Sequence, residues 1–292
     1  MKTTHMAVVS QIMTTPKVAS DYSIRQFQKE FPNDDACIDY IFQKKFGNYT
    51  CSCGNTKFYR VKGRKAFACS CGKQINPVAG TIFEKSSTPL TLWFYAIYLF
   101  SVSRNGVSGK ELQRQLGITY KCAWRIANQI RTLMAGNSDM LGGVVEVDET
   151  YIGGKGKTNA DKFKTKSAIM GMIERDGKVK ANLIPNRETH IVLNQIARNV
   201  KIGSKIMSDE YSAYKKLPKF GYKQGLIKHG KKHYVKGDIY TNTIEGFWGQ
   251  LKNSIRGTYH AVSPKHLQAY VDEFSFRYNH RDAVFSSLVA KI

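Results

Sequence analysis

The spacing of apolar positions along the chain changes at the glycine pair Gly142-Gly143. Before the pair, apolar residues recur every three or four positions, which predicts helices over residues 23–46 with a break near 32, from 88 onward, and over 108–116 and 120–134. After the pair, apolar and polar residues alternate, which predicts strands over residues 144–152, 167–174, 178–184 and 204–208. Helical spacing also occurs later, over residues 190–199, 242–255 and 263–278. The sequence therefore predicts an α/β protein with a domain boundary at the glycine pair.

Two matching Cys-Ser-Cys-Gly pairs flank a predicted hairpin whose turn is at Gly63. In a reducing compartment, such pairs favour a metal site over disulfides. Four thiolates around one tetrahedral ion make a zinc ribbon, although one residue separates the cysteines of each pair where two are usual. We therefore expect one structural Zn²⁺ on Cys51, Cys53, Cys69 and Cys71, whereas Cys37 and Cys122 are expected to be core residues.

The two helices predicted after residue 107 are separated by Gly117-Ile118-Thr119, a spacing that suits a helix-turn-helix. The second helix would bury an apolar stripe and display Lys121, Arg125 and Arg131 towards a DNA groove. Any helical hairpin with a solvated basic face would show the same pattern. We expect a helix-turn-helix that binds DNA, because the chain as a whole is strongly basic.

The formal net charge of +23 in 292 residues indicates a polyanionic partner. No acid occurs between Tyr211 and Gly237, where lysines including Lys231 and Lys232 accumulate, so this stretch is expected to guide a DNA backbone unless it is only a solvated face. No apolar run reaches the roughly 18 to 20 residues that span a bilayer, and the N-terminus has no signal-peptide pattern. We expect a cytoplasmic protein with no membrane partner.

Three carboxylates have positions that could serve one catalytic site. Asp148 lies on the first predicted strand, Asp209 ends the strand that begins near residue 204, and Glu245 lies on the helix that begins near residue 242. Each also has an ordinary interpretation, since Asp209 could cap a helix and Glu245 could close a capping box with Asn242 as the N-cap. Two divalent ions about 4 Å apart, held by oxygen ligands alone, can catalyse reactions of phosphodiesters. A strand, strand, helix distribution of acids suits a ribonuclease-H-like sheet, with Asp148 bridging both ions.

Between about Phe46 and Arg281, a series of sequence motifs resembles, in the same order, those of the bacterial insertion-sequence transposases of the ISXO type. These transposases carry an N-terminal zinc ribbon and use a DDE site. The matching words are Cys71-Gly72-Lys73-Gln74 with Gly80-Thr81-Ile82-Phe83, Trp93 with Ala96-Ile97-Tyr98, Val147-Asp148-Glu149-Thr150-Tyr151-Ile152-Gly153-Gly154-Lys155, Asn242-Thr243-Ile244-Glu245-Gly246-Phe247-Trp248 with Lys252, Gly257-Thr258-Tyr259-His260, and Phe276-Arg277-Tyr278-Asn279. The resemblance implies a DDE triad on Asp148, Asp209 and Glu245, with Lys252 as the basic residue that contacts DNA near the scissile phosphate.

The same resemblance implies a DNA transposase that binds the terminal inverted repeats of its element. It would cleave and join DNA strands with two Mg²⁺ or Mn²⁺ ions, with water and then a 3′-hydroxyl as nucleophiles. Its partners would be the double-stranded element ends and the target DNA. Because both ends of the element must be bound, the resemblance implies a homodimer in the DNA complex. The protein would act at the nucleoid in a bacterial cytoplasm.

Four regions are expected from these patterns: an N-terminal helical arm (1–46), a zinc ribbon (47–85), a helix-turn-helix region (86–141) and a ribonuclease-H-like DDE catalytic domain (142–292). The alternative is a non-catalytic DNA-binding regulator that uses the same ribbon and helix-turn-helix. In that alternative the three acids are caps and surface charges.

Overall fold

The computed structural model describes residues 22–136, 139–154, 166–226 and 241–292. The first 21 residues of the predicted N-terminal arm, and the predicted DNA contacts Lys231 and Lys232, lie outside the described residues. No helix in the described part of the chain is long and apolar enough to cross a membrane.

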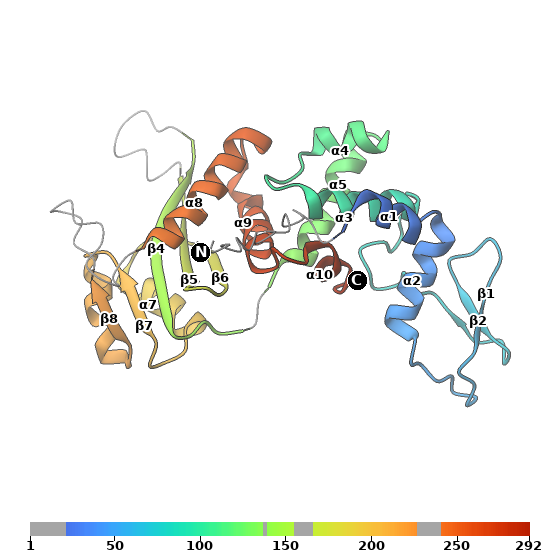
Figure 1. Cartoon of the computed structure of the whole chain (residues 1–292), viewed down its shortest axis with the longest axis horizontal. Helices are drawn as coiled ribbons and strands as arrows, with labels where there is room; N and C mark the ends of the chain where they lie inside the picture. Colours follow the sequence, from blue (N-terminus) through green and yellow to red (C-terminus); the bar gives the residue numbers. More distant parts are fainter. Residues whose placement is uncertain (1–21, 137–138, 155–165, 227–240) are drawn as a thin grey trace, which may run out of the picture.

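Five helices and a small sheet make up the first half of the chain (Figure 1). The helices are α1 (Ile24–Glu30), α2 (Asp34–Phe46), α3 (Leu90–Val102), α4 (Gly109–Leu116) and α5 (Tyr120–Met134). The sheet is antiparallel in the order β1 (Phe58–Arg60), β2 (Phe67–Cys69), β3 (Gln74–Ile75), so the predicted hairpin has a third strand.

Local capping residues explain where α4 and α5 begin and end. The Ser108 hydroxyl accepts from the N–H of Glu111, and the Thr119 hydroxyl accepts from the N–H of Cys122. Gly117 ends α4 with φ 63°, a left-handed conformation that glycine adopts without steric cost. Strong local signals of this kind are the reason why both helices match their predicted ranges.

A five-stranded mixed sheet forms the centre of the second half, which confirms the predicted α/β class (Figure 1). Its order is β6-β5-β4-β7-β8, with β4, β5 and β6 antiparallel and β4, β7 and β8 parallel. The strands are β4 (Val144–Gly153), β5 (Lys166–Glu174), β6 (Val179–Ile184), β7 (Lys205–Ser208) and β8 (Lys223–Leu226). Strand β8 lies in a stretch that the sequence analysis treated as loop.

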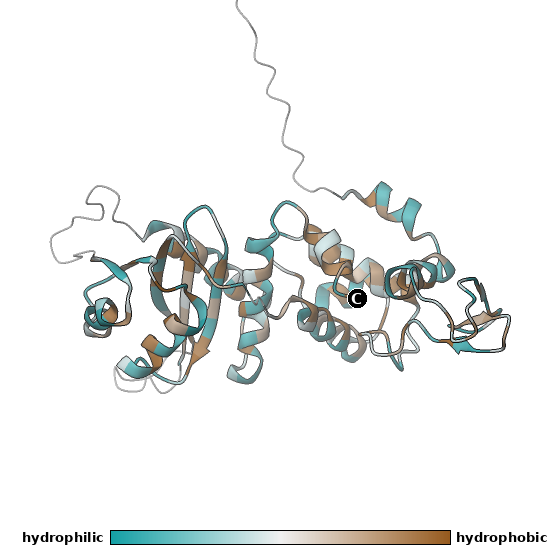
Figure 2. Ribbon diagram, turned by 90° about the horizontal axis from the view of Figure 1, so that it is seen from below, coloured by the Kyte–Doolittle hydropathy of each residue, from teal (hydrophilic) through white to brown (hydrophobic). Residues whose placement is uncertain are grey.

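Helices cover both faces of this sheet. On one face, α7 (Thr189–Asn199) and the 3₁₀ helix η1 (Ser212–Phe220) pack against Val145 and Val147. On the other face lie α8 (Asn242–Ser254), the π-helix η3 (Ile255–Tyr259) and α9 (Pro264–Asn279). Alternate residues of β4 therefore face different layers, so Glu146 and Asp148 point to the α8 side. Apolar residues lie both on these strands and on the helices that cover them (Figure 2).

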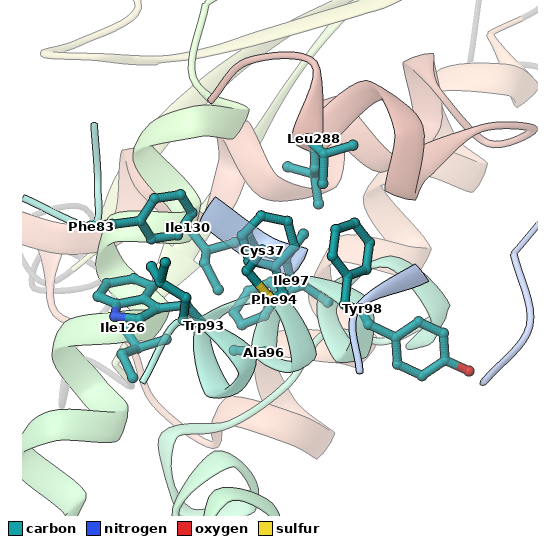
Figure 3. Close-up of a cluster of buried hydrophobic side chains, with 14 of the residues drawn as sticks. Cys37, Phe83, Trp93, Phe94, Ala96, Ile97, Tyr98, Ile126, Ile130 and Leu288 are labelled. Carbon is teal, nitrogen blue, oxygen red and sulfur yellow. The ribbon is translucent and has the colours of Figure 1, made fainter. Parts of the chain in front are cut away.

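The last helix, α10 (Val284–Val289), returns to the first half of the chain and packs on α3. Phe285, Leu288 and Val289 belong to the same buried cluster as α2, α3 and α5. Figure 3 shows Leu288 pointing toward the α3 side chains of that cluster. Both ends of the described chain thus share one core.

A buried ionic network joins the two halves and corrects one sequence-based expectation. Arg131 of α5 is only 2% exposed and donates from Nε to the Glu273 carboxylate of α9 at 2.8 Å. Arg277 donates to the same carboxylate at 2.7 Å and to the Ser103 carbonyl at 2.6 Å, and the Tyr259 hydroxyl lies 3.0 Å from it. Arg131 was expected to face a DNA groove. That expectation is wrong, because its guanidinium neutralises a buried acid.

Replacing Glu273 with glutamine should lower the free energy of unfolding by about 3–5 kcal/mol, because two arginines then stay buried without a counter-charge. Denaturant unfolding followed by circular dichroism measures this loss. Glu111→Gln is the matched control, since Glu111 pairs with Arg114 on the surface and should cost at most about 1 kcal/mol. Equal losses in the two variants would contradict a central role for Glu273.

Candidate active site and metal centre

The parallel pairing of β4 with β7 brings two of the expected acids level with each other. Glu146 pairs with Met207, so the same register continued by two residues sets Asp148 beside Asp209. Neighbouring strands lie about 4.8 Å apart. Asp209 follows β7 directly, and its Oδ1 accepts from the Tyr211 N–H at 3.0 Å, which fixes its side chain at the strand end.

Helix α8 connects the third acid to the first. Trp248 lies three residues after Glu245 and donates its indole N–H to Asp148 Oδ2 at 3.0 Å. The indole packs over Gly171, which is paired with Asp148 across β5. A Cβ at Gly171 would be 2.4 Å from the Trp248 ring, so this position requires glycine. The arrangement holds α8 close against the strand that carries Asp148.

The three acids share one electrostatic environment. Burial raises the pKa of Asp148, and the negative charges of Asp209 and Glu245 raise it further. The N–H of Glu149 and the indole N–H of Trp248 act in the opposite direction without cancelling the rise. A group with this shift accepts a proton more readily than an ordinary aspartate, so it gains from a nearby cation.

Counter-charges distinguish these acids from their neighbours. The buried carboxylate of Glu146 pairs with Arg175 at 3.2 Å, and that of Glu149 pairs with Arg187 at 2.8 Å. Asp148, Asp209 and Glu245 form no ion pair with a basic residue in the described ranges. Uncompensated like charges with oxygen donors are the ligand set that hard divalent cations prefer. The three acids thus have the donor chemistry of a magnesium or manganese site, although in the part of the chain that the structure describes only the four cysteines have ligand atoms that all lie within 4.8 Å of one another.

Glu146 is a site residue that the sequence analysis missed. It is completely buried and accepts from the N–H groups of Thr243 and Ile244 at 3.0 and 3.1 Å, and from the Thr243 hydroxyl at 3.0 Å. These are the unpaired donors of the first turn of α8. A carboxylate at this end of a helix also stabilises its dipole. The period-two pattern of β4 was the available signal, since it sets Glu146 on the same face as Asp148.

The cap of α8 differs from the prediction. The N-cap residue is Thr241 and makes no side-chain capping bond, whereas Asn242 is the first helical residue. Asn242 as N-cap of a capping box is therefore wrong. The reason is that Glu146 already serves the donors that a local cap would take. Glu245 is exposed, with only a long contact of 3.4 Å from the Thr241 hydroxyl.

On the opposite face of β4, Glu149 organises the loop that carries Asp209. It accepts from the Tyr214 hydroxyl at 2.5 Å, and the Arg187 guanidinium that pairs with it also stacks on Tyr211 at 4.5 Å. Burial and the adjacent Glu149 carboxylate raise the pKa of Tyr214 well above its usual value, so this tyrosine stays a donor.

Lys252 lies on α8 two turns after Glu245 and lines a pocket of about 270 Å³ beside the end of β4. Tyr151, Arg256 and His260 are among the other lining residues. Lys252 thus lies on the same helix as Glu245, about two turns further along it.

The remaining expected DNA contacts lie on α5 and differ in accessibility. Lys121 is exposed. Arg125 is half-buried, with its guanidinium 5.3 Å above the Trp93 ring and its Nη2 within 3.4 Å of the hydroxyls of Ser86 and Thr88. Only Lys121 of the three is therefore free to meet a ligand without breaking contacts inside the protein.

The four cysteines of the two Cys-Ser-Cys-Gly pairs converge on one point. Their sulfurs all lie within 4.8 Å of one another, with Cys51 3.6 Å from Cys71 and Cys53 3.5 Å from Cys69. Tetrahedral thiolates at a Zn–S distance of 2.3 Å would be about 3.8 Å apart, so the cluster could hold zinc. The backbone N–H of Cys53 lowers the pKa of Cys51 to about 6, and the N–H of Cys71 lowers that of Cys69. Cys37 is buried in the core, as expected.

Comparisons with known proteins agree with this picture. A family model described as an ISXO2-like transposase domain matches residues 140–279. An uncharacterized protein in the transposable element ISH50 of Halobacterium salinarum is 24% identical over 274 residues, which cover 85% of this chain and 92% of that protein.

Among solved structures, the chain is similar to one in the simian T-cell lymphotropic virus intasome in complex with PP2A regulatory subunit B56 gamma. The two are 13% identical with a TM-score of 0.28, over 56% of this chain and 58% of that one. The match therefore spans less than two thirds of the viral chain, and a similarity this low carries no argument about the fold.

Replacing Glu146 with glutamine should loosen the first turn of α8, because an amide cannot accept from all its donors and keep its pairing with Arg175. We expect a loss of about 1–3 kcal/mol in unfolding free energy and faster amide hydrogen exchange over residues 242–248. Asp34→Asn is the matched control, since Asp34 caps α3 through the N–H groups of Leu90 and Thr91 in the same way. That variant should speed exchange at the start of α3 only. Unchanged exchange in α8 of Glu146→Gln would refute the docking role.

Metal analysis of the purified protein should give about one zinc ion per chain. Cys53→Ala should remove it, because three sulfurs cannot close the tetrahedron, whereas Cys122→Ala should retain it, because Cys122 lies apart from the cluster. A preparation that never contains zinc, or one that keeps it without Cys53, would rule out the four-cysteine site.

Proposed function

We propose that the chain is a transposase of the insertion-sequence type, which cleaves and joins DNA at the ends of its own element; the ISXO2-like match over residues 140–279 and the relative in a transposable element support this. The observation that carries this proposal is the electrostatic interaction of Asp148 with Asp209 and Glu245, three acids that form no ion pair in the described ranges, while the neighbouring Glu146 and Glu149 each pair with an arginine.

In this proposal the three acids hold two Mg²⁺ or Mn²⁺ ions. When bound, such ions activate the attacking oxygen and stabilise the leaving oxygen of a phosphodiester. Asp148 would be the ligand shared by both ions, because its charge interacts with that of Asp209, which follows β7, and with that of Glu245 on α8. Water is the nucleophile for cleavage and a 3′-hydroxyl for joining.

Other side chains hold this site in place. The Trp248 N–H fixes one oxygen of Asp148, and Glu146 fixes the start of the helix that presents Glu245. Lys252 contacts the DNA backbone near the scissile phosphate, as its position on α8 and in a pocket with Arg256 allows. Losing Lys252 should therefore weaken DNA positioning before it weakens metal binding.

We propose a ribonuclease-H-like fold for the catalytic part. The supporting features are a mixed sheet of three antiparallel and two parallel strands, with acids on its central strand, on the adjacent parallel strand and on a covering helix. The catalytic domain would begin at the glycine pair and contain residues 142–292. Its final helix α10 packs in the core of the regions before residue 142, so it would also hold the catalytic domain against those regions.

The regions before residue 142 would recognise the element ends. The helices α4 and α5 with the turn at Gly117 form the proposed helix-turn-helix, in which Lys121 is the exposed basic residue. The four-cysteine ribbon over residues 47–85 would add a second DNA contact. Double-stranded element ends and target DNA are the partners, and a homodimer would hold two ends together at the nucleoid.

Asp148→Asn should abolish metal-dependent nicking of DNA that carries the inverted repeats flanking this gene, by about 100-fold or more, because it removes the shared ligand. Binding of the same DNA, measured by gel mobility, should persist. Asp176→Asn, in the exposed turn after β5, is the control and should nick normally. Unchanged nicking by Asp148→Asn would sink the proposed mechanism, and an absence of nicking in the unaltered protein would favour a non-catalytic regulator.

A further inference from the structure

A groove of about 770 Å³ lies between the α4–α5 helices and the segment that joins α8 to α9. One wall is formed by the starts of α4 and α5, and the opposite wall is formed by residues 257–263 with the first turn of α9. Arg131, already paired with Glu273, lies at its floor with the rings of Tyr259 and Tyr270 around it. The floor is therefore fixed, while the walls carry the accessible chemistry.

The α5 wall presents aromatic side chains to solvent. Tyr120 and Trp124 lie one turn apart on α5 and are 45% and 37% exposed. His266 from the opposite wall meets the Trp124 ring edge-to-face at 5.5 Å. Exposed aromatic rings that face each other across a groove have not been used for the core, so they are available to stack with a ligand.

Positive charge lies at the rim of the same groove. Lys110 is exposed and its ammonium lies 4.9 Å from the Tyr120 ring centroid. Arg114 is exposed as well, and the only acid on this rim, Glu111, is already held by Arg114 and Gln115. The rim therefore attracts an anion, while the aromatic wall attracts a flat ring.

The groove shares part of its lining with the pocket of Lys252. His260, Ala261 and Val262 line both cavities. His260 has φ 61°, a left-handed conformation that is uncommon for a residue with a side chain, and it follows directly on the π-helix η3. Such local strain and π-helical turns concentrate at functional sites. Residues 260–262 thus border both the groove and the pocket of Lys252.

We propose that this groove binds an unpaired stretch of DNA strand, with a base stacked on Trp124 and phosphates near Lys110 and Arg114. The proposal rests on the proposed function, because it adds a strand-holding site beside the acids of that function. Duplex DNA is a poorer occupant, since its bases are already stacked and expose only their edges. An unpaired base offers a π-face, and stacking on aromatic side chains tolerates any sequence.

Intrinsic fluorescence gives a direct test, because Trp124 is the exposed tryptophan of the three in the chain, and Trp93 and Trp248 are 0% and 3% exposed. Oligothymidine of twelve nucleotides, titrated into the full-length protein without added divalent metal, should quench the fluorescence. Trp124→Phe should lose the quenching but retain most of the binding. Trp124→Ala should weaken binding about tenfold, the usual scale of one lost stacking contact.

An abasic strand of equal length separates stacking from charge. The unaltered protein should bind it about tenfold more weakly than oligothymidine, and Trp124→Ala should cause no further loss. Phe220→Ala is the matched control, since Phe220 is also an exposed aromatic residue (55%) but lies outside the groove. It should bind both strands as the unaltered protein does.

Three outcomes would overturn the proposal. They are an absence of quenching by oligothymidine, equal binding by Trp124→Ala and the unaltered protein, and equal loss of oligothymidine and blunt duplex in Trp124→Ala. If any of these occurs while Asp148-dependent nicking of duplex ends persists, the groove assignment alone is wrong. If nicking fails but the quenching occurs as expected, the strand site stands and the proposed reaction is wrong.

Discussion

The fold depends on one carboxylate that has no contact with water. Burial alone would raise the pKa of Glu273, but the guanidinium groups of Arg277 and Arg131 outweigh burial and hold that pKa below its usual value. Two of its partners belong to the second half of the chain, and Arg131 belongs to α5. A buried charge without its partner is very costly, so α5 and α9 cannot separate without leaving Arg131 or Glu273 short of a counter-charge in the interior. The region that would read DNA and the region that would cut it are thus fixed to each other.

Within the second half, the placement of charge separates scaffolding from chemistry. Glu146 and Glu149 lie on opposite faces of β4, and each has an arginine partner that cancels its charge. Asp148 lies between them in sequence and has only neutral donors. Two neutralised acids therefore hold the neighbouring elements, and the acid between them is the one that we propose as a cation ligand. This division also explains why three glutamates or aspartates within four residues do not destabilise the strand.

Elements with local signals could be predicted from the sequence, and contacts that depend on distant residues could not. The ranges of α4 and α5 follow from Ser108, Gly117 and Thr119, and the alternation in β4 correctly separated the faces of Asp148 and Glu149. The candidate acids could be chosen because strand ends and helix faces are local properties. Their role in catalysis remains a proposal.

The predictions that were wrong or missing concern contacts between residues far apart in the sequence. Arg131 was assigned to a DNA groove because a helical wheel shows which residues share a face, but it does not show that a partner 142 residues away covers that face. Asn242 was assigned as a cap because Glu146, the real partner of the α8 donors, lies far away in the sequence. Strand β8 was missed because its four residues, Lys-Gln-Gly-Leu, show no apolar alternation, and the hydrogen bonds with β7 define the strand instead.

The docking of α8 on β4 has a further consequence for how the two acids can move. Glu146 and Trp248 attach α8 to β4, the strand that also carries Asp148. A small displacement of this strand would therefore carry Asp148 and Glu245 together, so the spacing of the two acids depends on the contact between strand and helix more than on the position of the whole sheet.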